Sequence, residues 1–151
     1  MSKLHLSAER LVDAPAPVVY ACIADYRHHH RPGGFLPPAF SDMHIERGGI
    51  GAGTVITFKV TIGGTSRALT QHVAEPEPGR VLVEANDRDQ TTFTVEPVGQ
   101  QSRVRFDTLL DTSGVQGLFT RLLAPRLLKP LYADELERLE RHARAQLTLA
   151  N

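Results

Sequence analysis

Six consecutive segments between residues 41 and 110 alternate apolar and polar side chains with a period of two. Alternation of this kind indicates β-strands that bury one face. Short stretches rich in Gly, Pro and Asn separate the segments, and such stretches are typical of turns. Because a parallel pair needs a crossover of a dozen or more residues, these short connections predict antiparallel neighbours. The expected strands are 41–47, 54–62, 66–75, 80–85, 91–97 and 103–110.

The residues before this block predict one more strand and a helix. Residues 4–12 are strand-like. Pro15 and Pro17 then open a short amphipathic helix that runs to about Asp25, because proline is tolerated in a first turn. Residues 26–40 are expected to be irregular or to form a second short helix.

The residues after the block predict one long helix at 114–149. Pro125 and Pro130 are expected to kink or break its early part. Apolar residues at steps of three or four form one stripe along it. The stripe consists of Leu128, Tyr132, Leu136, Leu139, Ala143 and Leu147.

Composition narrows the class of protein. A length of 151 residues predicts one domain, spanning 1–151. Seventeen basic against 17 acidic residues give no net charge, which argues against binding nucleic acid through bulk attraction to phosphates. A single cysteine, Cys22, excludes an intrachain disulfide framework. No run approaches the roughly 18 apolar residues of a transmembrane helix, and the start lacks signal-peptide features, so we expect a cytoplasmic protein.

The expected sheet and the long helix each carry one apolar face, so they should cover one another. A curved antiparallel sheet wrapped around the helix, in the α+β class, is the economical arrangement. Strong curvature would leave an apolar cavity between them. The low aromatic content of 6%, without tryptophan, mildly favours a cavity over a filled core. The inward set is expected to be Ile56, Phe58, Val60 and Ile62, then Val81 and Val83, then Phe93 and Val95, then Val104, Phe106 and Thr108.

Three stretches resemble one known family: VDAPAPVVY at 12–20, EPEPGRVL at 75–82 and YADELERL at 132–139. Together with the element order, they are similar to the START-like, polyketide cyclase/dehydrase (SRPBCC) superfamily. The resemblance implies the helix-grip fold, in which about seven antiparallel strands wrap around the C-terminal helix and two short helices follow the first strand. It also implies a ligand cavity between sheet and helix, but no particular reaction.

We therefore expect a hydrophobic small-molecule ligand as partner, no bound cofactor, and a monomer or homodimer. The side chains expected to line the cavity come from the strands, the first loop and the long helix. They are Tyr26, His30, Ile56, Phe58, Val60, Arg67, Leu69, Val83, Phe93, Val95, Phe106, Phe119 and Tyr132.

Two clusters suggest chemistry at first sight. The glycines at 48–53 superficially resemble a phosphate-binding loop, but a strand follows them where such a site needs a helix. His28, His29 and His30 are adjacent, so their side chains should point in different directions rather than converge on one metal. We expect no metal there; the alternatives are a solvated helix end, or His30 at the cavity entrance bonding a ligand oxygen.

Several single residues have two interpretations. His72 is expected to face outward, and would become a candidate general base only if the strand register were reversed. Arg67 lies near a strand end, where it either extends to solvent or binds a ligand carboxylate. Arg105 and Asp107 should face solvent, and Cys22 should be an inert core thiol.

Three classes of function stay open. The apolar inward set favours a binding protein for a lipid- or polyketide-like molecule. A cyclase/dehydratase would use the same cavity to hold a polycarbonyl chain for aldol closure, with one or two polar groups moving protons. A co-chaperone-like interaction module is the third. The sequence carries no Gly-x-Ser-x-Gly motif and no recognisable carboxylate pair, which favours binding over catalysis.

Overall fold

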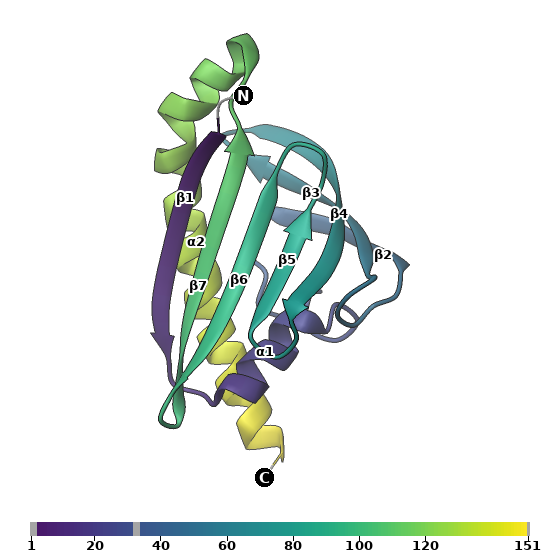
Figure 1. Ribbon diagram of the computed structural model, residues 1–151, viewed down its shortest axis with the longest axis vertical. Helices are drawn as coiled ribbons and strands as arrows, with labels where there is room; N and C mark the ends of the chain where they lie inside the picture. The colour runs from purple at the N-terminus through teal and green to yellow at the C-terminus, as the bar shows by residue number, and fades with distance from the viewer. Residues whose placement is uncertain (1–2, 32–33, 151) are drawn as a thin grey trace.

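A computed structural model describes residues 3–31 and 34–150, with the side chains of 114–123 and 150 left out. The chain forms one sheet, a short helix near its start and a long helix at its end (Figure 1). The elements are β1 (Lys3–Val12), α1 (Ala16–Ala24), β2 (Phe40–Arg47), β3 (Val55–Ile62), β4 (Thr65–Glu77), β5 (Val81–Ala85), β6 (Gln90–Val98), β7 (Gln101–Asp111) and α2 (Gly114–Ala150).

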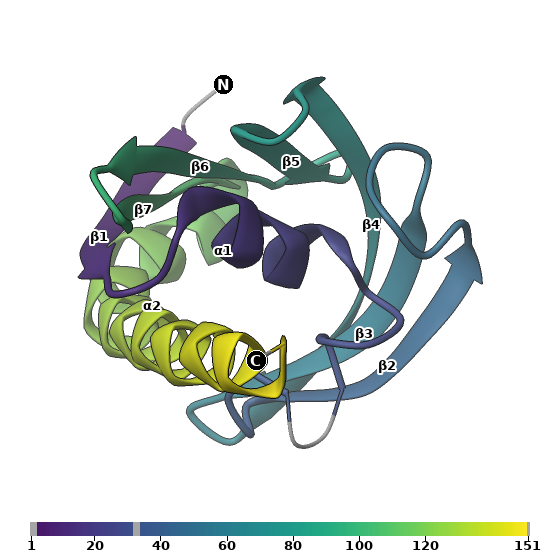
Figure 2. The same ribbon diagram turned by 90° about the horizontal axis from the view of Figure 1, so that it is seen from below.

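The seven strands are antiparallel throughout and follow the order β1-β7-β6-β5-β4-β3-β2. Strands β2 to β7 form a meander, and β1 crosses over to pair with β7. Figure 2 shows the sheet curling strongly, with α1 and α2 on its concave side. This is the helix-grip arrangement, and the predicted sheet around a long C-terminal helix is confirmed.

Among the described residues one short helix follows β1, so the expectation of a second one is wrong. The described residues between α1 and β2 form turns and bends. The side chain of Asp25 accepts hydrogen bonds from the backbone N–H groups of Arg27 and His28, which replaces helical bonding at this point. Pro37 and Pro38 disfavour a helix further along the segment.

The predicted effect of Pro125 and Pro130 was a kink or a break; the long helix continues through both without a break. Each proline removes one backbone hydrogen bond, but the apolar stripe beyond them is buried against the sheet, including Leu136 and Leu139. This packing outweighs the loss over most of the helix. Figure 1 shows the first turns of α2 set at an angle to the remainder. No helix in the described part of the chain is both long enough and apolar enough to cross a membrane.

The register of β5 differs from the expectation. Leu82 lies opposite Phe93 and Glu84 lies opposite Thr91, so Leu82 and Glu84 share the concave side with the buried Phe93. Val83 was expected to point inward, together with Val81, and both lie on the other face. The run Val-Leu-Val contains no alternation that fixes the side, so hydrophobicity could not set the register of this strand.

Candidate functional site

Three ionisable side chains are buried on the concave side of the sheet, close enough for the charges of Glu84 and Glu135 to influence their neighbours' pKa values. Tyr26 follows α1 and is 1% exposed, Glu84 comes from β5, and Glu135 comes from α2 and is 7% exposed. The hydroxyl of Tyr26 donates a hydrogen bond of 2.5 Å to Oε1 of Glu84. No described residue donates a hydrogen bond to the Glu135 carboxyl. The sheet and both helical regions thus contribute to one polar cluster in a mainly apolar interior.

The surroundings of the two carboxyl groups bring their pKa values close to neutrality. Burial raises the pKa of Glu84 to about 7, although the hydrogen bond from Tyr26 acts in the opposite direction. Burial raises the pKa of Glu135 to about 8, and the charges of Glu84 and Asp134 add to the effect. The pKa of Glu135 is raised further than that of Glu84, so Glu135 holds its proton to higher pH than Glu84 does. Such a pair can act as acid and base at physiological pH.

Further polar groups continue this cluster across the sheet. The hydroxyl groups of Thr91 and Thr108 lie 3.0 Å apart, and Thr108 acts to lower the pKa of Tyr132. Burial raises the pKa of Tyr132 to about 12, so its phenol stays protonated. Gln71 on β4 is 7% exposed, and its Oε1 has no hydrogen-bond partner among the described residues. An orphaned buried acceptor of this kind is available to a ligand that carries a donor.

Aromatic rings form the apolar wall next to these polar groups. Phe93 and Phe106 pack edge to face with their centroids 4.7 Å apart, and Tyr132 lies 6.4 Å from Phe106. Phe40 and Phe58 make a second pair on the β2–β3 side. An apolar wall with a few convergent polar groups is the usual composition of a small-molecule site.

Most side chains expected at the cavity do face the interior. Val60 and Leu69 are half-buried, and Arg67 is exposed at the end of β4, where its side chain extends to solvent. The side chain of Phe119 lies outside the described residues. Val83 lies on the opposite face of the sheet, as stated above. The buried ones are Tyr26, His30, Ile56, Phe58, Phe93, Val95, Phe106 and Tyr132.

His28, His29 and His30 point in three directions, as expected. His28 Nδ1 lies 2.7 Å from Asp25 Oδ2. His30 is buried, stacks on Tyr26 and lies with its Nε2 2.7 Å from the carbonyl oxygen of Ile23, to which it donates. Burial lowers the pKa of His30 to about 4, so it is a neutral core residue. His29 instead contacts His142 of α2, at 2.7 Å between Nδ1 and Nε2.

Sequence reasoning missed the three polar residues at the centre of the site. Glu84 was missed because β5 was assigned the opposite face. Glu135 borders the apolar stripe of α2, three residues after Tyr132 and four before Leu139, and the prediction of the stripe did not include it. Gln71 lies between Leu69 and Val73 on β4, and this position could have revealed it, since all three share a face by alternation.

The glycine-rich stretch 48–53 has a structural role. Tyr26 and Gly51 donate backbone hydrogen bonds that join this loop to the end of α1, at 2.8 Å to the carbonyl of Gly49 and 2.9 Å to that of Ala24. Glu75 accepts hydrogen bonds from the hydroxyl of Tyr20 at 2.6 Å and from the backbone of Ala52 at 2.7 Å. A strand, β3, follows the loop, so the prediction that it is not a phosphate-binding loop is supported.

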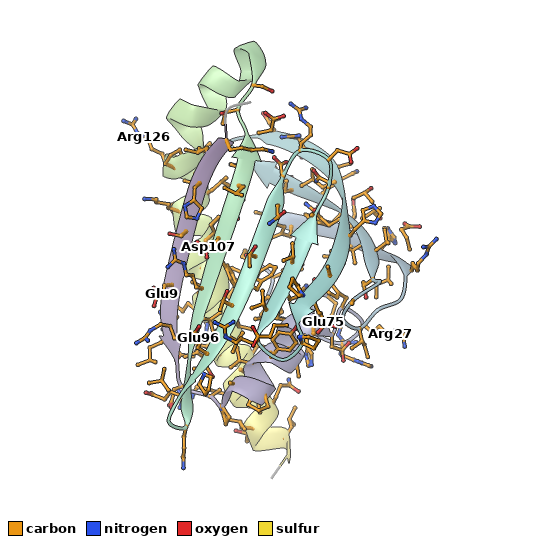
Figure 3. The ribbon with its side chains drawn as sticks, in the orientation of Figure 1. Glu9, Arg27, Glu75, Glu96, Asp107 and Arg126 are labelled. Atoms are coloured by element: carbon orange, nitrogen blue, oxygen red, sulfur yellow. The ribbon has the colours of Figure 1, made fainter. Side chains whose placement is uncertain are left out.

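Exposed ion pairs occupy the convex face of the sheet. Figure 3 shows Glu9, Glu96 and Asp107 on this side, away from α2. Asp107 accepts from Arg105 at 2.8 Å, and Arg80 pairs with Glu96 at 2.7 Å. The expectation that Arg105 and Asp107 face outward is confirmed, and exposed pairs of this kind contribute little to stability.

Comparison with known proteins agrees with this architecture. Residues 3–144 match the family described as polyketide cyclase / dehydrase and lipid transport. The solution structure of the KanY protein is 30% identical, with a TM-score of 0.80, and the match covers 95% of this chain and 99% of that one. No curated protein matches this sequence.

Two more distant structures share the fold. The crystal structure of TTHA0849 from Thermus thermophilus is 20% identical, with a TM-score of 0.74 over 95% of this chain and 99% of that one. The ZhuI aromatase/cyclase from Streptomyces sp. R1128 is 14% identical, with a TM-score of 0.73 over 97% of this chain and 96% of that one. On the match over residues 3–144, the chain belongs to the polyketide cyclase/dehydrase and lipid transport family of the START-like (SRPBCC) superfamily.

Proposed function

We propose that the concave side of the sheet binds a hydrophobic or amphipathic molecule with carbonyl groups and catalyses proton transfer on it, as a cyclase/dehydratase does. The observation that carries this proposal is the cluster of Tyr26, Glu84 and Glu135, whose two carboxyl groups have pKa values of about 7 and 8. A protein that only stores an apolar ligand does not need two such groups in its interior, where each costs stability when ionised.

The two carboxyl groups suit opposite halves of an aldol closure. Glu84, as carboxylate, removes a proton from the carbon next to a carbonyl group, which gives an enolate. The enolate carbon forms a bond to a second carbonyl carbon of the same chain. Glu135, as neutral acid, gives its proton to the alkoxide that results, so protons and charge balance. Tyr26 positions Glu84 through its hydrogen bond. General acid–base catalysis of this kind contributes roughly 10²–10⁴-fold.

Binding without chemistry is the second candidate, and the apolar ring wall with the orphaned Gln71 acceptor favours it. A ligand donor bonded to Gln71 would orient an amphipathic molecule without any proton transfer. The two candidates share the same site. They differ in whether its carboxyl groups transfer protons to and from the ligand.

Solvent deuterium exchange separates the candidates. The probe is α-tetralone, an aromatic ketone with one enolisable CH₂ group, followed by NMR in D₂O. We expect the wild-type protein to accelerate exchange, Glu84→Gln to reduce the rate by roughly 10²-fold or more, and Glu96→Gln on the convex face to leave it unchanged. The proposal is wrong if wild type and Glu84→Gln exchange at the same rate. Ligand that co-purifies in native mass spectrometry, with no difference in exchange, would support binding alone.

A further inference from the structure

Cys22, His29 and His142 come together from three parts of the chain outside the carboxylate cluster. Cys22 lies on α1, His29 in the turn that follows, and His142 near the end of α2. One possible ligand atom from each residue lies within 4.8 Å of the other two. Cys22 is 1% exposed, and the two histidines are partly buried. The thiol is therefore at the base of the group, with the imidazoles nearer to the surface.

We propose that Cys22, His29 and His142 bind a Zn²⁺ ion. Thiolate sulfur and imidazole nitrogen are the donors that zinc prefers, and three protein ligands with one open position form a common coordination set. Around a tetrahedral zinc ion two imidazole nitrogens lie about 3.3 Å apart. His29 Nδ1 and His142 Nε2 lie 2.7 Å apart. Small rotations of the two rings bring them to that separation, and the ion replaces their hydrogen bond.

The open position has room for a further ligand. His29 and His142 line a surface pocket of about 630 Å³, together with Asp25, His28, Arg31, Gly34, Gln146 and Leu149. A water molecule or an anionic group in the pocket can reach the ion from this side. Arg31 would favour an anion, because its guanidinium is always charged. Asp25 is already bonded to His28, at 2.7 Å, so it is not counted among the ligands.

This site is not a metal bound by the three adjacent histidines, which the sequence spoke against. Adjacent histidines do not converge here: His28 contacts Asp25 and His30 contacts the carbonyl of Ile23. Only His29 joins the group, and its partners are 7 residues before it and 113 residues after it. Ligands drawn from separate elements are the usual pattern for transition metals, and such a set is visible only once the chain has folded.

Bound zinc would fasten the two helical regions of the molecule to one another. Cys22 and His29 belong to α1 and the turn after it, while His142 belongs to the last turns of the long helix. Because metal ligands are rarely preformed in the unfolded chain, binding energy at this site adds to folding stability. The site is distinct from Tyr26, Glu84 and Glu135, so its outcome does not depend on the proposed catalysis.

The test uses the full-length protein without a polyhistidine tag, stripped of metal by chelator and dialysis. Zn²⁺ affinity is measured by competition with a chromophoric chelator, and Co²⁺ is added as a spectroscopic substitute. We expect one ion per chain, a thiolate-to-cobalt charge-transfer band and the strong visible bands of tetrahedral coordination. His142→Ala, His29→Ala and Cys22→Ser should each weaken Zn²⁺ binding by more than the roughly 10–100-fold that outer-shell partners cost.

His28→Ala is the matched control, because His28 lines the same pocket without belonging to the three ligands. It should keep the affinity and the cobalt spectrum. Since Cys22 is buried, circular dichroism of each metal-free variant checks that it folds, and His142→Ala provides the readout if Cys22→Ser does not. Zn²⁺ that binds equally well to His142→Ala, a cobalt spectrum without the thiolate band, or equal losses in His28→Ala would each overturn the proposal.

Discussion

The phenol of Tyr26 donates a hydrogen bond of 2.5 Å to Oε1 of Glu84, across 58 positions of sequence. It joins the segment after α1 to the middle of the sheet, and both groups lie on the concave side. Burial raises the pKa of Tyr26 well above its usual value, and the nearby charge of Glu84 adds to this. The proton therefore stays on the phenol, and Glu84 is the acceptor over the whole physiological range.

Removing this hydrogen bond should raise the pKa of Glu84. The bond stabilises the carboxylate, so Tyr26→Phe should move the pKa of Glu84 above its value of about 7. Glu84→Gln should lower the pKa of Glu135 from about 8, because it removes one of the negative charges that raise it. Titration of ¹³C-labelled glutamate side chains by NMR measures both. Glu96→Gln should move neither, and an unchanged Glu84 in Tyr26→Phe would contradict the assignment.

Glu135 makes the stability of the protein fall as the pH rises. Its pKa is about 8 in the folded protein against 4.5 for an ordinary glutamate, so the unfolded chain releases a proton that the folded state retains. Stability is therefore full below about pH 4.5 and declines up to about pH 8.

Glu135→Gln should remove this decline, because glutamine does not titrate. We expect the variant to be more stable than wild type by roughly 2–4 kcal/mol at about pH 9, and nearly equal to it at about pH 4. Chemical denaturation at a series of pH values measures the difference. Glu137→Gln, on the exposed side of α2, is the control and should follow the wild-type curve.

The sequence predicted the architecture well because the fold rests on periodic patterns. The strands with clear alternation, such as β3 and β7, have the predicted inward faces, since a one-residue slip would expose Phe58 or Phe106. The long helix was found from its apolar stripe. The second short helix was a mistake, because the local bonding of Asp25 competes with helix formation and leaves no periodic signal of its own.

The site was harder to predict because its polar residues interrupt apolar patterns. Glu84 stands beside a run of three apolar residues on β5 that fits either face, and only pairing with β6 places it inside. Its contact with Tyr26, and its electrostatic influence on Glu135, join segments that are far apart in sequence. Contacts of this range follow from the curvature of the sheet, which no local pattern encodes.

The side-chain amide of Gln71 should lower the stability of the ligand-free protein. Its Oε1 is buried without a partner among the described residues, and an unsatisfied buried polar group costs about 1–3 kcal/mol. Gln71→Met keeps the length of the side chain and removes the amide, so it should stabilise the protein by about 1 kcal/mol or more. Thermal or chemical denaturation tests this, with the exposed Gln90→Met as control. A destabilised Gln71→Met would mean that the amide is satisfied in solution.

The carboxyl of Glu140 should stabilise the junction between β1 and α2 at neutral pH. Its Oε1 accepts from Arg10 Nε at 3.1 Å and Nη2 at 2.7 Å, and its Oε2 accepts from the backbone of Asp13 at 2.7 Å. Burial acts to raise its pKa, but the hydrogen bonds from Arg10 and Asp13 and the charge of Arg10 together hold the pKa below its usual value.

This contribution is present above about pH 4.5 and is lost as the pH falls through the lowered pKa. Glu140→Gln should therefore cost about 1–2 kcal/mol at about pH 7 and less in acid. Urea denaturation at several pH values measures the change. A loss of equal size in acid and at neutral pH would assign the effect to packing and not to charge. Arg10→Ala combined with Glu140→Gln should cost less than the sum of the two single changes.

Substitution of Phe106 tests whether the interior is filled by side chains or has open space. It is 1% exposed and packs edge to face against Phe93, and the ring of Tyr132 lies with its centroid 6.4 Å away. In a close-packed surrounding Phe106→Ala should cost about 3–5 kcal/mol, because the cavity left behind adds to the lost burial. Leu109→Ala on the same strand, where the side chain is 38% exposed, should cost much less. Equilibrium denaturation gives both values.

A loss in Phe106→Ala well below about 3 kcal/mol would mean that one side of the ring already borders open space, as a ligand-binding wall does. Added ligand should then stabilise wild type more than the variant, since the ring is part of the binding surface. The full loss with equal ligand stabilisation would place the ring in the core and outside the ligand-binding surface. The ring pair with Phe93 should contribute about 0.5–1.5 kcal/mol of this loss, which a double-mutant cycle isolates.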